Sequence, residues 1–273
     1  MKKIIICQPL DCGLNDTLCQ IGLCIKYSRD YNRKLIIDTE RHSGMVKDFG
    51  DYFVNNNIDN KDFIQLSLSD IELDLLGEQT KSLLTSSKPL SVDFLNNHEE
   101  EVLVHRSSGG GLSSAYALDF FKLQPNLAQT IQNKLNSMPD GYCSVFIRNT
   151  DYRTNYKELF EFIKSDIGDR YLLVCTDDYH VIDYAKTQFS KLICNEDIER
   201  NAIPARHAMR RCQRHLDHNK VNIDAITDLI LGAASMKLYP SVVSFPYNIK
   251  SGFVALGTYL NENKNIINNL LTR

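Results

Sequence analysis

The stretch CSVFIRNTDYRTNYKELFEFIKSDIGDRYLLVCTDD, residues 143–178, contains a strand–helix–strand unit. Residues 143–148 and 171–176 are short apolar runs that end in polar residues, which is typical of buried strands. Between them, residues 157–167 are expected to form a helix. Parallel strands need a crossover of this kind, so the stretch predicts the start of a parallel sheet.

The same alternation continues on both sides of this stretch. Toward the C-terminus we expect a helix, a strand, a helix, a strand and a helical tail over residues 179–189, 191–194, 223–234, 237–243 and 251–273. Toward the N-terminus we expect strands at 3–8, 35–38, 63–68 and 102–105, and helices at 15–29, 44–53 and 125–135. Strands that alternate with helices predict an α/β protein whose parallel sheets are covered on both faces.

A turn cluster, MPDG at residues 138–141, divides this pattern into two halves. We therefore predict an N-terminal α/β domain over residues 1–138 and a C-terminal α/β domain over residues 139–273. Ligands of such folds bind at the carboxyl ends of strands, so the informative loops follow Gln8, Arg148, Thr176 and Val243.

Composition narrows the class of protein. The chain has 273 residues, is 43% hydrophobic and carries a net charge of −3 with mixed signs, which argues against a nucleic-acid partner. No apolar run approaches the ~20 residues of a spanning helix, and the run Ile4–Cys7 is too short for a signal peptide. The eight cysteines show no CxxC pair and are expected to be reduced thiols. We expect a cytoplasmic protein.

Arg148 is the first candidate for chemistry, because it ends a strand and is followed by Asn149 and Asp151. Its planar guanidinium suits bidentate contact with a phosphate. Asp151 can brace that guanidinium or cap the next helix. A surface arginine followed by an ordinary turn is the competing interpretation.

Two further segments carry polar residues at strand ends. Thr176, Asp177 and Asp178 close one strand and open a helix, which suits either helix capping or hydrogen bonding to a base or ribose. Asp228 is an acid on an otherwise apolar helix, where a charge needs a partner. Ser241 and Ser244 lie where the next strand ends and can bind phosphate oxygens, or they form a plain turn.

Together, these segments resemble the three donor-site motifs of the α1,2-, α1,6- and protein O-fucosyltransferases. Residues 146–151 match an H-x-R-x-x-D motif except that Phe146 replaces histidine, and Asn149 stands where a second arginine is frequent. The T-D-D turn and the aspartate-bearing helix with its serine-rich turn follow in the same order. Residues 12–16, CGLND, resemble the Gly-rich first loop of the family.

This resemblance implies a GT-B type fold of two Rossmann-like domains facing each other across a cleft. It implies metal-independent, inverting transfer from a nucleotide sugar, with GDP-fucose or a related GDP-sugar as co-substrate and no further cofactor. Arg148 would hold the β-phosphate. The donor-binding residues would be Gly13, Asn15, Arg148, Asp151, Thr176, Asp177, Asp178, Asp228, Ser241 and Ser244.

The base that activates the acceptor is expected to be a carboxylate. Asp16 and Glu158 are the candidates, and Asp16 is preferred because its loop follows the first strand. The segment HRSSGGG, residues 105–111, resembles a phosphate-cradling loop but lacks the P-loop pattern, so it is read as a mobile surface loop near the acceptor. The basic segment 206–215 is a solvated face, a lid over the donor, or a contact with anionic lipid at the inner face of the membrane.

We expect the acceptor to be a glycan or a lipid-linked glycan in surface polysaccharide or lipopolysaccharide biosynthesis. Two other functions stay open. One is a nucleotide-sugar-binding protein without transferase activity, in keeping with Phe146 and Asn149. The other is an unrelated two-domain phosphatase in which Asp11 or Asp38 does the chemistry.

Overall fold

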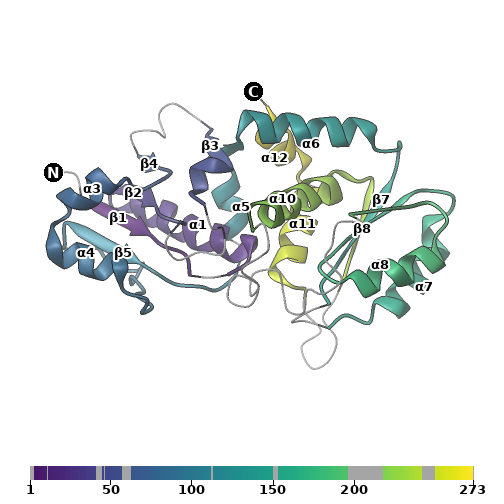
Figure 1. Ribbon diagram of the computed structural model, residues 1–273, viewed down its shortest axis with the longest axis horizontal. Coiled ribbons are helices and arrows are strands. Elements are labelled where there is room, and N and C mark those ends of the chain that lie inside the picture. Colours follow the sequence, from purple (N-terminus) through teal and green to yellow (C-terminus); the bar gives the residue numbers. More distant parts are fainter. Residues whose placement is uncertain are drawn as a thin grey trace. The chain divides into compact units, whose positions relative to one another are not determined.

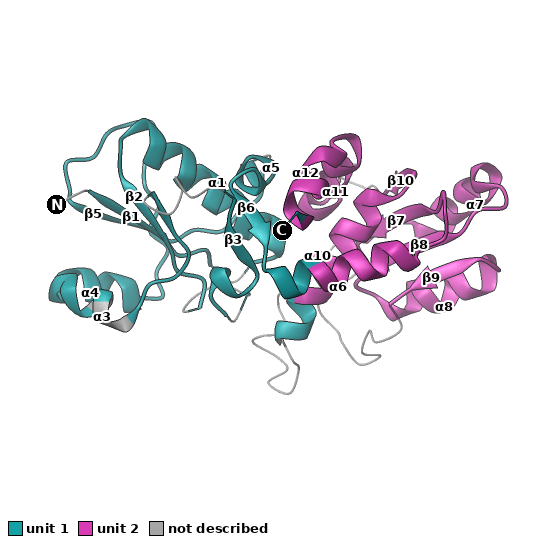
Figure 2. Ribbon diagram, turned by 90° about the horizontal axis from the view of Figure 1, so that it is seen from above, with its two compact units in different colours: residues 1–128, 217–222, 272–273 teal, residues 129–216, 223–271 magenta. Residues whose placement is uncertain are grey.

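The computed structural model describes residues 3–10, 12–40, 45, 47–56, 63–111, 113–149, 153–195, 218–241 and 250–272. It divides the chain into two compact units (Figure 2). Unit 1 comprises residues 1–128, 217–222 and 272–273, and unit 2 comprises residues 129–216 and 223–271. The division passes through a helix that ends at Ser137, whereas the sequence places a boundary just after this helix.

Unit 1 begins with a strand and a long helix (Figure 1). Its elements are β1 Ile4–Cys7, α1 Leu14–Asp30, β2 Lys34–Ile37, η1 Phe49–Asp51, β3 Phe53–Asn55, β4 Ile64–Gln65, α3 Asp70–Leu75, α4 Gly77–Thr85, β5 Val102–His105, α5 Ser113–Leu118, β6 Phe121–Leu123 and the start of α6 Pro125–Ser137. In the described part of residues 44–53 the expected helix is wrong, because a single 3-10 turn leads directly into β3.

Four of these strands form a parallel sheet in the order β4-β2-β1-β5. The side chains of Ile6, Ile36 and Val104 alternate onto one face and pack with Leu84 of α4. Helix α1 packs against β1 and β2 and meets α5 at close range. The approach requires Gly22, because a Cβ there would collide with the main-chain oxygen of Ser113. β3 and β6 pair separately as an antiparallel ribbon.

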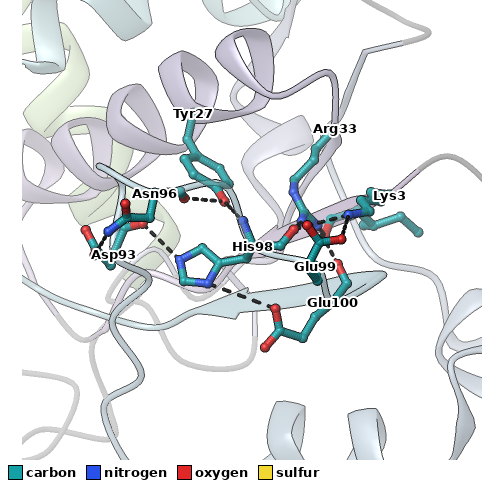
Figure 3. A network of polar contacts seen from close by, with 9 residues as sticks. Lys3, Tyr27, Arg33, Asp93, Asn96, His98, Glu99 and Glu100 are labelled. Carbon is teal, nitrogen blue, oxygen red and sulfur yellow. Dashed lines mark hydrogen bonds and ion pairs between the residues drawn. The ribbon is translucent and has the colours of Figure 1, made fainter.

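The amino-terminal edge of this sheet is closed by a polar network (Figure 3). Arg33 is fully buried, and its guanidinium donates to the main-chain oxygens of Ile4 (3.4 Å), Glu100 (2.9 Å) and His98. The Tyr27 hydroxyl accepts the main-chain N–H of His98 at 3.3 Å. These bonds fix the segment that enters β5, at the edge opposite to the one where ligands of such sheets bind.

Unit 2 repeats the strand–helix rhythm. It contains β7 Cys143–Ile147, α7 Tyr156–Ile167, β8 Leu172–Thr176, α8 Tyr179–Gln188, β9 Leu192–Cys194, most of α10 His218–Ala234, β10 Lys237–Pro240, α11 Gly252–Glu262 and α12 Lys264–Leu271. The sheet order is β10-β7-β8-β9, and all pairs are parallel.

Both sheets have the same topology. Counted along its own sheet strands, each unit has the order 3-2-1-4, which matches the first four strands of the Rossmann order 3-2-1-4-5-6. The predicted fold class, α/β with two Rossmann-like domains, is confirmed. In such sheets the order reverses next to the first strand, so the ligand crevice is expected between β1 and β5 in unit 1 and between β7 and β10 in unit 2.

The two faces of the unit 2 sheet differ. Val145 and Ile147 pack with Phe160 of α7 and Val181 of α8 in an apolar core. On the other face the Ser144 hydroxyl donates to a main-chain oxygen of α10 at 2.7 Å. Successive side chains of β7 therefore face opposite sides of the sheet. Val145 and Ile147 face α7 and α8, and the alternate residues face α10 and α11.

Candidate donor and acceptor sites

The ends of β7 and β8 bring Arg148 and Asp177 together in unit 2. Ile147 pairs with Thr176 in the sheet, so the next residue of each strand lies side by side. Arg148 Nε lies 3.0 Å from Asp177 Oδ2, and the two side chains are 21% and 8% exposed. A buried carboxylate on Nε fixes the direction of the guanidinium, because Nε is the guanidinium nitrogen nearest the main chain.

Asn149 holds the loop after β7. Its main-chain N–H donates to Asp177 Oδ1 at 3.0 Å, and its side-chain amide donates to Asp178 Oδ2 at 2.7 Å. Its amide oxygen accepts the main-chain N–H of Thr154 at 3.2 Å, and the Thr154 hydroxyl donates to the carbonyl of Arg148 at 2.6 Å. The asparagine that departs from the family motif thus links two strand ends.

Thr176 and Asp178 serve the start of α8. Asp178 is the N-cap, with Oδ1 accepting the main-chain N–H of His180 at 2.9 Å. The Thr176 hydroxyl accepts the main-chain N–H of Asp178 at 3.2 Å. Capping therefore occupies both side chains, and their contact with a base or ribose stays a prediction.

Phe146, which stands at the histidine position of the family motif, is a core residue. Its ring is 1% exposed and meets Phe253 edge to face, with centroids 5.4 Å apart. A Cβ added to Gly232 of α10 or to Gly257 of α11 would collide with this ring. The ring therefore fits between two helices only because both carry glycine at the contact.

The other predicted donor residues of unit 2 flank the same strand ends. Ser241 is buried and directly follows β10, the neighbour of β7. The main-chain oxygen of Asp228 in α10 accepts the thiol of Cys175, a β8 residue, at 3.6 Å. Arg148 and Ser241 thus end the two strands where the sheet order reverses. Asp151 and Ser244 lie outside the described residues.

The predicted first loop lies in unit 1 at the start of α1. Gly13 is the N-cap, and its carbonyl accepts the N–H of Thr17 at 3.0 Å. Asn15 is 3% exposed, and its amide donates to Asp16 Oδ1 at 3.2 Å. Asp16 is half-buried. The start of α1 therefore places the Asp16 carboxylate beside the side-chain amide of Asn15.

Glu158, the second candidate base, has a different environment. It lies in the first turn of α7, is exposed, and accepts the side-chain amide of Asn155 at 2.7 Å. Asp16 belongs to unit 1 and Glu158 to unit 2. Glu158 therefore bonds to a residue at the start of its own helix, and the choice between the two carboxylates stays a prediction.

Two residues considered for phosphate chemistry are internal. Arg106 is fully buried, and its Nε and Nη2 donate to Gln8 Oε1 at 3.1 and 2.5 Å, while Nη1 donates to the carbonyl of Lys88 at 2.9 Å. Burial lowers the pKa of Arg106, and Asp38 opposes this shift. Asp38 is fully buried and accepts the Gln8 amide at 2.6 Å. This arrangement gives no support to a phosphatase centred on Asp38, and Asp11 lies outside the described residues.

The described ranges hold no cluster of three or more His, Cys, Asp or Glu side chains suited to a metal ion. Among the helices of these ranges, none is long and apolar enough to cross a bilayer. The basic segment 206–215 falls outside what the structure describes.

Solved structures of fucosyltransferases share this fold, in agreement with the predicted GT-B type. The structure of NodZ from Bradyrhizobium has a TM-score of 0.59 at 14% identity, and the match covers 94% of this chain and 92% of that one. NodZ α-1,6-fucosyltransferase crystallised with GDP gives a TM-score of 0.60 at the same identity and coverage. A variant of Arabidopsis thaliana FUT1 in complex with GDP gives 0.51 at 10% identity, covering 96% of this chain and 69% of that one.

No protein-family model matches this sequence, and a search of curated proteins finds no match.

Sequence reasoning missed several contacts of these sites. The bonds of Asn149 and Thr154 join residues that a motif comparison treats separately. The bonds of Gln20 to Gly109 and to His105 join residues 89 and 85 positions apart. For the bonds of Gln20, the only signal in the sequence was the glycine run itself.

Proposed function

We propose that this protein is an inverting, metal-independent glycosyltransferase that moves a sugar from a nucleotide donor to a glycan hydroxyl, with GDP-fucose as the donor. The observation that carries the proposal is the Arg148–Asp177 pair at adjacent strand ends, next to the position where the sheet order reverses. The fold is shared with NodZ, of which structures soaked with GDP-fucose and co-crystallised with GDP are known.

In this proposal Arg148 holds the β-phosphate and stabilises the departing diphosphate. The bond between the anomeric carbon and the phosphate oxygen breaks, and its electron pair leaves with GDP. Negative charge therefore grows on the leaving group, where a pre-oriented cation stabilises the transition state more than the ground state. Asp177 orients this cation through Nε.

The remaining contacts with the donor are assigned from the positions of the residues near the ends of the unit 2 strands. Ser241 and Ser244 bind phosphate oxygens, and Asp228, Asp178 and Thr176 line the nucleoside. Ser241 is supported by its place directly after β10, and Asp228 by the bond from Cys175 to its carbonyl.

Asp16 acts as general base in this proposal. As the acceptor oxygen bonds to the anomeric carbon, its proton passes to the Asp16 carboxylate. The support is the Asn15 amide, which donates to Asp16 Oδ1 and so keeps the carboxylate oriented. General-base assistance of this kind contributes about 10²–10⁴-fold to a rate.

We further propose a cytoplasmic location and a glycan or lipid-linked glycan acceptor in surface polysaccharide or lipopolysaccharide biosynthesis. Six of the seven described cysteines are buried, as small apolar side chains are, which supports structural thiols in a reducing compartment. The basic segment 206–215 supports contact with an anionic acceptor or lipid.

The test is thermal stabilisation by GDP, UDP, CMP and ADP with and without Mg²⁺, followed by GDP release from GDP-fucose. A ligand at 100 times its Kd stabilises the native state by about 2.7 kcal/mol. We expect a selective, Mg²⁺-independent response to GDP. Arg148→Ala should lower GDP release by about 10²–10³-fold, whereas Arg153→Ala, which removes an exposed arginine of the same segment, should leave it unchanged.

Other outcomes would overturn parts of the proposal. Stabilisation by GDP without any sugar release or transfer would favour a non-catalytic nucleotide-sugar-binding protein. A response to another nucleotide alone would reject GDP-fucose. Full activity of Arg148→Ala would reject the mechanism.

A further inference from the structure

The glycine run after β5 is held in place by side chains of α1. Ser107 to Gly111 follow β5. This strand pairs with β1, and the order of the unit 1 sheet reverses between the two strands. The carbonyl of Ser107 accepts the N–H of Leu10, in the loop after β1, at 2.9 Å. The carbonyl of Gly111 accepts the thiol of Cys19 at 3.2 Å. The mobile loop expected from the sequence therefore has fixed contacts at both ends.

A buried relay fixes the middle of the run. His105, 1% exposed, accepts the main-chain N–H of Val92 on Nδ1 at 3.2 Å, so its proton is on Nε2. Nε2 lies 2.9 Å from Oε1 of Gln20, which must accept this proton. The orientation of the Gln20 amide follows, and its nitrogen donates to the carbonyl of Gly109 at 2.6 Å.

The relay holds Gly110 against the candidate base. A Cβ on Gly110 would lie 2.7 Å from Asp16 Oδ1 and 3.3 Å from the side-chain nitrogen of Asn15. A Cβ on Gly111 would meet nothing within 4 Å. Neither glycine has the positive φ that Gly109 has, so both positions accept alanine without backbone strain.

A second observation indicates a ligand at this point. Asn15 is 97% buried, and within the described residues its Oδ1 has no hydrogen-bond partner. A buried acceptor without a donor is costly, and a hydroxyl group of a bound molecule would satisfy it. The amide nitrogen of the same side chain is already bonded to Asp16.

We propose that residues 107–110 form the wall of the acceptor-hydroxyl site, that Gly110 is the specificity-determining position that leaves room in front of Asp16, and that Gln20 and His105 are positioning residues for this wall. The proposal rests on the proposed function and adds to it a place for the attacking hydroxyl, whether that of a sugar or of water. A side chain at position 110 displaces the Asp16 carboxylate rather than the backbone, because the nearest atom is the end of a flexible side chain.

The experiment compares Gly110→Ala with its neighbour Gly111→Ala. The readouts are GDP release from GDP-fucose, with water as the attacking hydroxyl, its pH–rate profile, and thermal stabilisation by GDP. We expect Gly110→Ala to lose about 10²-fold in rate and the acidic limb that a carboxylate base produces. Gly111→Ala should keep the wild-type rate, and both variants should keep the wild-type response to GDP.

Gln20→Met tests the relay. It removes both relay bonds at nearly constant volume and should lower the rate by about tenfold while keeping the acidic limb, because Asp16 remains the base. The alanine pair decides the proposal even if Gln20→Met fails to fold. Equal rates for the two alanine variants, or a loss of the GDP response in Gly110→Ala alone, would overturn the assignment of the wall. A wild-type protein that neither responds to GDP nor releases it from GDP-fucose would reject the proposed function and this inference with it.

Discussion

Placing at position 146 the histidine of the fucosyltransferase motif should damage this protein rather than activate it. In Phe146→His an apolar ring packed between Gly232, Gly257 and Phe253 becomes an imidazole with two polar nitrogens. The neighbouring main-chain groups belong to helices α10 and α11, and the carbonyl of Gly232 already accepts the Ser144 hydroxyl and the main-chain N–H of Ser235. The new ring therefore has no evident partner at this position.

The magnitude follows from two losses. An unsatisfied buried polar group costs about 1–3 kcal/mol, and the edge-to-face aromatic pair contributes about 0.5–1.5 kcal/mol. The free energy of unfolding should therefore fall by roughly 2–4 kcal/mol at pH 8. For a chain of this size the Tm should fall by roughly 4–16 °C.

The pH dependence separates this explanation from a simple packing defect. A buried imidazole stays neutral in the folded state, whereas the unfolded histidine gains a proton below a pKa of about 6.5. The free energy of unfolding of Phe146→His is therefore highest above pH 6.5 and falls by about 2 kcal/mol between pH 6.5 and 5. Phe146→Leu, the matched control, leaves a smaller apolar side chain, and its penalty should not change with pH.

The assay is thermal unfolding followed by far-UV circular dichroism at pH 8 and pH 5, with GDP release measured on the same samples. A Phe146→His variant as stable as the wild type, or one with a higher rate of GDP release, would refute the reasoning. So would an equal pH dependence in the leucine control.

Two further predictions concern unit 1. Burial lowers the pKa of His105 to about 4, so this side chain stays neutral in the folded state while it is protonated below about pH 6.5 in the unfolded state. The free energy of unfolding of the wild type should therefore fall by roughly 3 kcal/mol between pH 6.5 and 4. Urea titrations at several pH values should show that His105→Gln loses most of this dependence. Gly22→Ala should lower the free energy of unfolding by about 2 kcal/mol or more, because its Cβ meets a main-chain oxygen of α5. Gly50→Ala, where the Cβ would meet a side-chain carbon at 3.3 Å, is the milder control, and equal unfolding midpoints for the two would contradict the close approach.

The parts of the fold that were predictable are those set by local patterns. The strand before Arg148 and the helix after it lie within one residue of the expected bounds, because a buried parallel strand is a short apolar run and its crossover helix has a 3.6-residue period. The parallel pairing also follows from the alternation, whereas the strand order within each sheet does not. The strand β3, by contrast, was not predicted, and the expected helix 44–53 ran into its first residue, because its partner β6 is 66 or more residues away and no local signal reports the pairing.

The candidate site divides in the same way. The sequence located Arg148 and Asp177 at strand ends, and the register of β7 and β8 explains their contact. It did not explain why Phe146 is not histidine, because the answer lies in two glycines on helices that follow some 85 and 110 residues later. Contacts that depend on which helices pack together cannot be read from periodicity alone.

The buried thiols give each unit its own reporter of opening. Cys7, Cys12, Cys19 and Cys24 are at most 8% exposed in unit 1, and Cys143 and Cys175 are at most 4% exposed in unit 2. A thiol reacts with an alkylating reagent as the exposed thiolate, so these side chains become labelled only when their surroundings open. Brief alkylation during a denaturant titration, followed by peptide mass spectrometry, would therefore yield two separate unfolding curves from the unmodified chain, one for each Rossmann-like sheet.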